Sequence, residues 1–304
     1  MISVNGREIS ITTFPNKERK VDINCSIDSQ VFVNWKYEND GDFLLLNMVD
    51  DAIDRKRIEE STDTNKVNCI INSMPYERMD RSQNGSVFSL KVACNLLPKG
   101  WNYTIIAPHS DVCVNLLKST VKGTVKKIHV HNYLFNEVKE NDVLSHLFEE
   151  KNVLVFPDEG AKNRYSKILS EQGSIPYLEI VYGKKHRNFE TGNIEKLTLL
   201  DERGLEVKDL NGINAIVVDD LSSYGGTFIK LKEVLDECCV KEAHLFLEKA
   251  EDSILKGRVL DNYDSVHTTN LMMDLQTDDF NNPNFFVKSS NEIVSMEFLS
   301  MALK

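Results

Sequence analysis

Short runs of apolar, often β-branched residues alternate with stretches of helical periodicity along most of the chain. Polar residues end each run before the next helical pattern begins. This order is typical of β-α-β units, in which parallel strands form a sheet and the connecting helices cover its faces. The pattern predicts an α/β fold with mainly parallel sheets. Strands are expected at 67–74, 102–108, 152–157, 177–183, 213–220 and 243–248, and helices at 42–60, 89–97 and 227–239.

The length of 304 residues favours two domains, because one domain usually comprises roughly 100–200 residues. The stretch 119–145 carries turn-forming and charged residues and is expected to be the least structured part of the chain. We therefore expect a domain junction near residue 140, with an N-terminal domain over 1–140 and a C-terminal domain over 141–304.

The net charge is −11, which argues against broad electrostatic binding to nucleic acid or to an anionic membrane. No apolar run approaches the roughly 20 residues that a bilayer-spanning helix needs, and the N-terminus lacks the pattern of a signal peptide. The six cysteines form no C-x-x-C pair and are too sparse for a disulfide framework. These features predict a cytoplasmic protein with reduced thiols and without a nucleic-acid or membrane partner.

The segment VVDDLSSYGGTF (217–228) combines an apolar strand, two carboxylates and a Gly-Gly-Thr turn that leads into a helix. Small residues let backbone N–H groups surround a phosphate, and a helix N-terminus favours an anion. Asp219 and Asp220 could bind sugar hydroxyls or hydrated Mg²⁺ from the end of the strand. An ordinary strand-to-helix turn with an acidic start would have a similar composition.

VVDDLSSYGGT resembles the phosphoribosyl-pyrophosphate loop of type I phosphoribosyltransferases and of ribose-phosphate pyrophosphokinases, whose usual pattern is two apolar residues followed by D-D-x-x-D-T-G/A-G-T. Ser223 stands in place of the third Asp, and Tyr224 in place of the Thr. The resemblance implies two similar phosphoribosyltransferase-like domains. It also implies a ribose-phosphate site formed by Asp219, Asp220, Ser223, Tyr224, Gly225, Gly226 and Thr227.

Two further segments resemble the pyrophosphokinases and imply an ATP site. MPYERMDR (74–81) is similar to the P-Y-x-R-Q-D-R segment of that family, with Met79 in place of the usual Gln, and phosphoribosyltransferases lack this segment. FPNKE (14–18) is similar to a family loop that reaches the adenine bound by a neighbouring subunit. The resemblance thus implies a homo-oligomer, a dimer or a hexamer, and ATP contacts by Arg78, Met79, Asp80, Phe14, Asn16 and Glu18.

Other similarities imply the metal site and the catalytic cations. PHSD (108–111) and NVLVFPDEGAKNR (152–164) match family segments that bind Mg²⁺, which implies His109 and Asp158 as ligands, although Ala107 replaces an Asp of the family pattern. GKKHRN (183–188) resembles a mobile catalytic loop, which implies Lys185 and Arg187 as catalytic residues and leaves Lys184 as an alternative to Lys185.

Two more histidines, His129 and His131 in IHVHN, alternate and could form a metal pair on one side of a strand. Because no acidic or cysteine partner lies nearby in the sequence, we expect surface histidines on an edge segment.

The implied activity is transfer of the diphosphoryl group of ATP to the anomeric hydroxyl of ribose 5-phosphate, with Mg²⁺ as cofactor and AMP as the second product. Tyr224 could instead offer a stacking surface to a larger ester of ribose 5-phosphate, such as ADP-ribose. Two other classes stay open. A phosphoribosyltransferase would use the 217–227 loop and would not need the PYERMDR and FPNKE segments. A non-catalytic regulatory relative would keep the fold but lose catalytic groups, and Met79, Ala107 and Ser223 are replacements in that direction.

Overall fold

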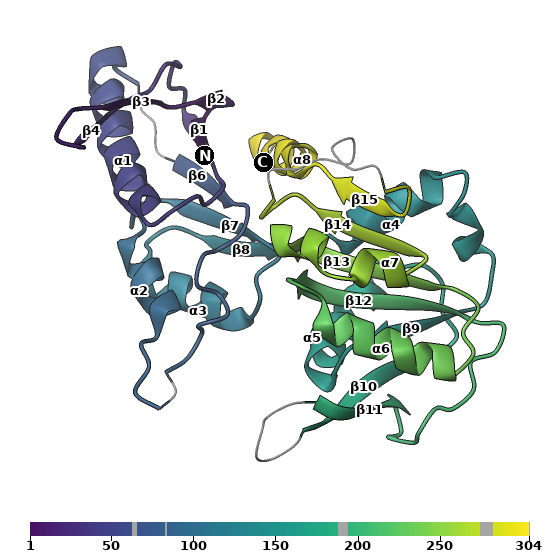
Figure 1. Cartoon of the computed structure of the whole chain (residues 1–304). Helices are drawn as coiled ribbons and strands as arrows, with labels where there is room; N and C mark the ends of the chain where they lie inside the picture. The colour runs from purple at the N-terminus through teal and green to yellow at the C-terminus, as the bar shows by residue number, and fades with distance from the viewer. Residues whose placement is uncertain (63–65, 83, 188–193, 274–281, 304) are drawn as a thin grey trace. The chain divides into compact units, whose positions relative to one another are not determined.

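The computed structural model of the chain describes residues 1–62, 66–82, 84–187, 194–273 and 282–303 (Figure 1). The chain forms two compact units: Met1–His129 together with Ser290–Lys304, and Val130–Ser289. The division falls before residue 140, and the C-terminal segment returns to the first unit. The stretch 119–145 is also more regular than expected, since it contains strand β8 (Val125–Ile128) and helix α4 (His131–Glu140).

The first unit is built on a sheet with the order β2-β1-β5-β6-β7-β8. Strands β5 to β8 are parallel neighbours, as the β-α-β pattern predicts, and β1 and β2 extend the sheet in the antiparallel sense. Trp35 and Ile71 pair across β5 and β6 and are fully buried. The bounds of the other strands are β1 (Ile2–Val4), β2 (Arg7–Glu8), β5 (Gln30–Trp35), β6 (Lys66–Ile71) and β7 (Asn102–Ile106).

Helices cover both faces of this sheet. Apolar residues of α1 (Gly41–Glu60), α2 (Ser89–Leu96) and α3 (Asp111–Thr120) share one core with alternate residues of the strands. On the other face, Phe298 of α8 (Ser290–Ala302) lies against Phe32 of β5, with ring centroids 5.0 Å apart. A separate hairpin, β3 (Ser10–Thr13) with β4 (Arg19–Asp22), belongs to the same unit.

The second unit is built on a sheet with the order β11-β10-β9-β12-β13-β14-β15. Its strands are parallel except for β11, which pairs with β10 in the antiparallel sense. The bounds are β9 (Asn152–Phe156), β10 (Ile180–Arg187), β11 (Ile194–Asp201), β12 (Asn214–Ser222), β13 (Ala243–Ala250), β14 (Ser265–Thr269) and β15 (Phe285–Lys288).

Alternate residues of β12 point to opposite faces of this sheet, as the period of a strand requires. Ala215 and Val217 belong to the core beneath α6 (Gly226–Glu237), and Ile216 and Val218 to the core beneath α4 and α5 (Glu159–Gln172). Figure 1 shows α6 and α5 on the two sides of the sheet. The shorter helices are η1 (Ser145–Phe148), η2 (Asp252–Lys256) and α7 (Val259–Asn262).

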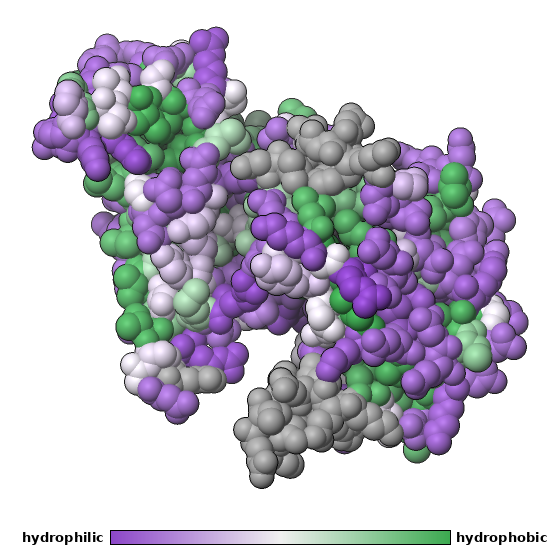
Figure 2. Space-filling model, in the orientation of Figure 1, coloured by the Kyte–Doolittle hydropathy of each residue, from purple (hydrophilic) through white to green (hydrophobic). Residues whose placement is uncertain are grey.

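The predicted fold class is confirmed, because each unit has a mainly parallel sheet between helices and each expected strand and helix is present. All six cysteines are free thiols. Figure 2 shows a face that is mainly hydrophilic in both units, with smaller hydrophobic patches, in keeping with the charged composition. Among the described residues, no helix has the length and apolar character needed to cross a membrane.

Candidate functional site

Several of the predicted site residues lie where strands of the second sheet end. Asp158 follows β9 after Pro157 and caps α5, with its Oδ1 atom accepting a hydrogen bond of 3.0 Å from the backbone N–H of Ala161. Asp219 and Asp220 lie near the carboxyl end of β12, which is the neighbour of β9. Because the strands are parallel, these carboxylates lie at one edge of the sheet, where open α/β sheets bind their ligands.

Lys185 joins this group from the neighbouring strand β10. Its Nζ atom lies 2.7 Å from Oδ2 of Asp158, and its side chain is 17% exposed. Burial would raise the pKa of Asp158, but the Lys185 ammonium and the Ala161 N–H outweigh this effect, so the pKa of Asp158 lies below its usual value. The contact with Lys185 therefore favours the charged form of the Asp158 carboxylate at the predicted metal site.

Arg164 of α5 pairs with the second carboxylate of the Asp219–Asp220 segment. Its Nη1 atom lies 3.2 Å from Oδ2 of Asp220, and the Asp220 side chain is almost entirely buried. Burial and the adjacent Asp220 charge raise the pKa of Asp219 well above its usual value. The two neighbouring carboxyl groups thus differ in environment. The Arg164 guanidinium compensates the charge of Asp220, whereas Asp219 favours its protonated form.

The loop from Ser222 to Thr227 is held against η2 and α7. Gly225 has φ of 78° and precedes α6, and a Cβ atom at this position would lie 1.7 Å from Cγ2 of Val259. Ser223 Oγ lies 2.8 Å from Oγ of Ser253. Only glycine therefore fits the turn that places the loop before the N-terminus of α6, where backbone N–H groups favour an anion. The Tyr224 side chain is 60% exposed on this loop.

In the first unit, the MPYERMDR and PHSD segments contact each other. Oε2 of Glu77 accepts a hydrogen bond of 2.9 Å from the backbone N–H of His109, and Oδ2 of Asp80 accepts one of 2.9 Å from the Ser110 hydroxyl. Arg81 lies 2.9 Å from the other oxygen of Asp80. Although burial acts in the opposite direction, these contacts lower the pKa of Asp80. Arg78 and Met79 are exposed beside this buried anchor.

The FPNKE segment forms the tip of the β3–β4 hairpin. The backbone N–H of Phe14 donates to the Glu18 carbonyl over 2.8 Å, and the N–H of Glu18 donates to Oδ1 of Asn16 over 3.2 Å. Phe14, Asn16 and Glu18 are all exposed. The hairpin thus presents an aromatic ring, an amide and a carboxylate to the surroundings.

The structure brings together Asp158, Lys185 and the Asp219–Asp220 segment in the second unit, and Asp80 with His109 in the first. The expected loop position of Lys185 and Arg187 is wrong, since both belong to β10, where Lys185 pairs with Leu197 of β11 and Arg187 with Ile194. The side chains of His186 and Arg187 and the whole of Asn188 lie outside the described residues.

Asp158 suits Mg²⁺, which is usually bound by one or two carboxylates together with water and substrate phosphates. Its carboxylate is 43% exposed, so one oxygen can accept a further contact. In the part of the chain that the structure describes, no three His, Cys, Asp or Glu side chains form a site that the protein alone could supply to a metal. This donor set fits a metal that arrives with a phosphorylated substrate.

Sequence reasoning missed several residues of the site. Arg164 belongs to the PDEGAKNR segment and lies in the second turn of α5. Six residues are about 1.7 helical turns, so the spacing from Asp158 alone gives no signal that Arg164 faces the Asp219–Asp220 segment. The interpretation of His131 as a surface residue is wrong: its side chain is 1% exposed, and its Nε2 atom lies 3.1 Å from the Asp219 carbonyl oxygen. His129 is also buried.

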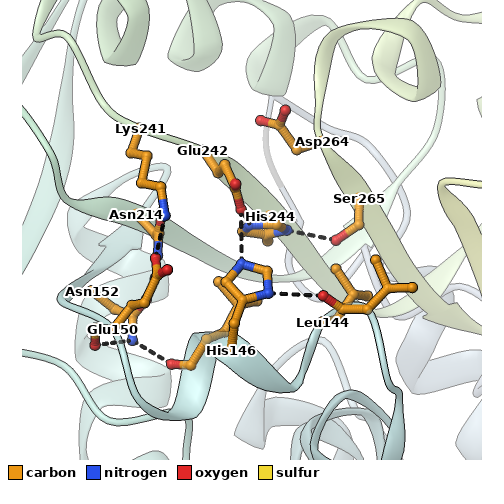
Figure 3. A network of polar contacts seen from close by, with 12 residues as sticks. Leu144, His146, Glu150, Asn152, Asn214, Lys241, Glu242, His244, Asp264 and Ser265 are labelled. Carbon is orange, nitrogen blue, oxygen red and sulfur yellow. Dashed lines mark hydrogen bonds and ion pairs between the residues drawn. The ribbon is translucent and has the colours of Figure 1, made fainter.

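A different polar network lies at the amino ends of the strands of the second sheet, opposite to the carboxyl ends that carry the candidate site (Figure 3). Glu242, at the amino end of β13, accepts contacts of 3.1 Å from Nε2 of both His146 and His244, and His244 contacts the Ser265 hydroxyl over 2.8 Å. Lys241 and Asn214 both donate to Glu150. These residues link the starts of several strands. A position at the amino ends of parallel strands is typical of a stabilising network rather than of a ligand site.

Comparison with curated proteins gives relatives named ribose-phosphate pyrophosphokinase. The chain is 26% identical over 225 residues to a ribose-phosphate pyrophosphokinase of Saccharolobus solfataricus, covering 71% of this chain and 67% of that protein. A ribose-phosphate pyrophosphokinase of Sulfolobus acidocaldarius is 26% identical over 205 residues, 64% of this chain and 63% of the relative. The matched segment thus spans about two thirds of the relatives' own length. No family model matches the chain.

The phosphoribosylpyrophosphate synthetase of Mycobacterium smegmatis has a similar fold, with a TM-score of 0.69, 17% identity, and coverage of 98% of this chain and 91% of that one. The resemblance predicted from the motifs is therefore confirmed. The curated homologues carry the name of a diphosphotransferase, which confirms the predicted enzyme class.

Proposed function

We propose that this chain, a homologue of the ribose-phosphate pyrophosphokinases, transfers the diphosphoryl group of ATP to the anomeric hydroxyl of ribose 5-phosphate or of one of its esters. The observation that carries the proposal is the cluster at the carboxyl edge of the second sheet, where the Asp158–Lys185 pair lies beside the Asp219–Asp220 segment and the loop before α6. The similarity of the chain to ribose-phosphate pyrophosphokinases supports the same reaction.

On the acceptor side, Asp219 and Asp220 would bind the ribose hydroxyls, and the backbone of residues 223–227 would hold the 5-phosphate. Arg164 keeps the Asp220 carboxylate in place through their 3.2 Å contact. Positioning of this kind contributes much of the rate in phosphoryl transfer, because the protein forms no covalent bond with the substrate. The anomeric oxygen would attack the β-phosphorus, the bond to the α-phosphate oxygen would break, and AMP and a proton would be released.

On the ATP side, Arg78, Met79 and Asp80 are the proposed nucleotide contacts within the chain. Asp80 is anchored by Ser110 and Arg81, so the exposed Arg78 and Met79 are presented from a fixed turn. The Lys185 ammonium would leave Asp158, or keep this contact while also contacting the transferred diphosphoryl group, and would stabilise the negative charge that grows on that group. Arg187, two residues further along the strand, is the second proposed catalytic cation.

We propose Mg²⁺ as the cofactor, with Asp158 as the proposed ligand in the second unit and His109 as the proposed ligand in the first. When bound, Mg²⁺ would supply neutralisation of phosphate charge and would make the β-phosphorus more electrophilic. The residues themselves contribute the anionic anchor at Asp158 and its alignment by the Ala161 N–H at the start of α5.

The identity of the acceptor depends on Tyr224. Its ring is 60% exposed rather than buried in the loop, so it is available for stacking on a group attached to the 5-phosphate. We therefore include ADP-ribose as a candidate acceptor. Competition at equal concentrations decides: a much larger kcat/KM for ribose 5-phosphate would remove the extended substrate and leave Tyr224 as a solvent-exposed replacement.

We also propose that the hairpin tip at Phe14, Asn16 and Glu18 completes the ATP site of a second copy of the chain, in a dimer or hexamer. The exposure of these side chains at the end of a hairpin supports this role. Mixing two inactive variants tests it. Complementation between a Glu18→Ala chain and a Lys185→Ala chain would restore part of the activity if the site is shared.

Product analysis by mass spectrometry tests the reaction. With Mg²⁺, ATP and a ribose 5-phosphate compound, AMP and a diphosphorylated sugar should appear in equal amounts. Release of ADP or orthophosphate would contradict the proposal. Formation of a nucleotide from phosphoribosyl pyrophosphate and a base would favour a phosphoribosyltransferase, and binding of nucleotides without turnover would favour a regulatory relative.

A further inference from the structure

The peptide group that joins Asp219 to Asp220 has both of its polar atoms fixed. Its N–H, on Asp220, donates to Oδ1 of Asp219 over 2.9 Å, and its carbonyl oxygen, on Asp219, lies 3.1 Å from Nε2 of His131. Rotation of this peptide plane would swing both carboxylates away from their present directions. The orientation of the two acidic side chains is therefore set by an imidazole that comes from a different element, α4.

The carbonyl needs such a partner because of the sheet topology. Strand β12 pairs with β9 only as far as Val217, whereas it pairs with β13 through Ser222. Beyond Val217, β12 has a neighbouring strand on one side only. Buried backbone carbonyls that face the other side must accept hydrogen bonds from donors outside the sheet. Since a carbonyl oxygen only accepts hydrogen bonds, Nε2 of His131 must carry the proton.

The imidazole is held in turn by a buried framework. Glu248, which is completely buried on β13, accepts a hydrogen bond of 2.9 Å from the N–H of Val130 and one of 2.8 Å from the Tyr165 hydroxyl. The ring of His131 lies edge-on to the ring of Tyr165, with centroids 4.8 Å apart. Both the backbone before His131 and its ring are thus fixed from β13 and α5.

We propose that His131 is a positioning residue for the acceptor site, acting through the Asp219 carbonyl to fix the directions of the Asp219 and Asp220 carboxylates. Glu248 holds the Val130 N–H and the Tyr165 hydroxyl, and these two residues in turn place the ring of His131. The inference rests on the proposed binding of a ribose phosphate at these two aspartates. It assigns to His131 a donor function toward the backbone, distinct from packing.

Two substitutions separate the donor from the packing. His131→Gln keeps an N–H donor and loses the aromatic ring, whereas His131→Phe keeps a ring against Tyr165 and loses the donor. His267→Phe is the matched control, because His267 is 2% exposed in the same unit, stacks between Phe246 and Phe286, and contacts Ser265.

The measurements are calorimetric binding of ribose 5-phosphate and of ADP-ribose, and the KM values for acceptor and ATP. We expect His131→Phe to weaken acceptor binding and raise the acceptor KM by about tenfold or more, with the KM for ATP within about twofold of wild type. His131→Gln and His267→Phe should stay within about threefold in all values. Wild-type affinity in His131→Phe, or a larger loss in His131→Gln than in His131→Phe, would overturn the proposal.

The outcome is separable from that of the proposed reaction. If the wild-type chain binds a ribose phosphate but releases no AMP, the proposed function fails, while the binding contrast between the His131 variants still decides this inference. Should His131→Phe fail to fold, the ¹⁵N spectrum of histidine-labelled wild-type protein decides it. A proton on Nε2 of His131 is required, and a neutral ring protonated only on Nδ1 would refute the donor role.

Discussion

Replacement of Lys185 by methionine tests the assignment of the catalytic cation. The Lys185 ammonium lies 2.7 Å from Asp158 and is mostly buried, so its charge acts where water screens it weakly. Loss of one such contact to developing charge typically raises the barrier by about 2.7–4 kcal/mol, which corresponds to a fall in kcat of about 100-fold to 1,000-fold. Methionine keeps most of the side-chain volume, and the strand pairing of β10 with β11 does not depend on the ammonium.

The matched control is Lys184→Met. Lys184 is exposed, and as the adjacent residue of a strand it points to the opposite face from Lys185. Initial rates of AMP release at saturating ATP and acceptor should fall as stated in Lys185→Met and change by less than about threefold in Lys184→Met, with unchanged circular dichroism in both. Near-normal turnover in Lys185→Met would refute the assignment, as would an equal loss in the two variants.

Three further changes give distinct expectations. Asp158→Asn keeps an oxygen that can accept a hydrogen bond from the Ala161 N–H, so the fold should persist. The Mg²⁺ concentration for half-maximal activity should rise by about tenfold, and an unchanged Mg²⁺ titration would exclude Asp158 as a ligand. Gly225→Ala should lower stability by more than Gly204→Ala, because both have positive φ but only the Cβ at Gly225 meets another side chain, 1.7 Å away; equal urea midpoints would contradict this. Burial lowers the pKa of His267 from 6.5 to about 3 in the folded protein. Between these two pKa values only the unfolded state protonates this imidazole, so the free energy of unfolding should fall by about 1.4 kcal/mol per pH unit on acidification. His267→Gln should remove that part of the slope between about pH 6 and pH 4, and identical slopes in urea unfolding would show that His267 is not buried in its neutral form.

Much of the fold follows from local sequence. The runs at 152–157, 213–220 and 243–248 are mainly apolar because both faces of their strands are covered, and the structure has β9, β12 and β13 there. The two carboxylates that end the run at 213–220 also predicted that Asp219 and Asp220 lie at the end of a strand. Asp158 is instead implied by the family resemblance.

Other features depend on contacts that are distant in sequence. The polar run at 183–187 reads as a loop, yet it is a strand because β11 pairs with it. His131 lies 88 residues from Asp219 and in a segment of turn-forming composition, so neither its burial nor its role at the carbonyl has a local signal. The return of Ser290–Ala302 to the first unit is likewise a matter of long-range packing, seen in the contact between Phe298 and Phe32.

The most direct measurement of the central claim uses ATP labelled with ³²P at the β-phosphorus. Diphosphoryl transfer carries this atom to the sugar, so the label should appear in the diphosphorylated ribose product, and the AMP should be unlabelled. Transfer of a single phosphoryl group would leave the label in ADP. A labelled ADP product, or labelled inorganic phosphate or pyrophosphate without a labelled sugar, would contradict the account.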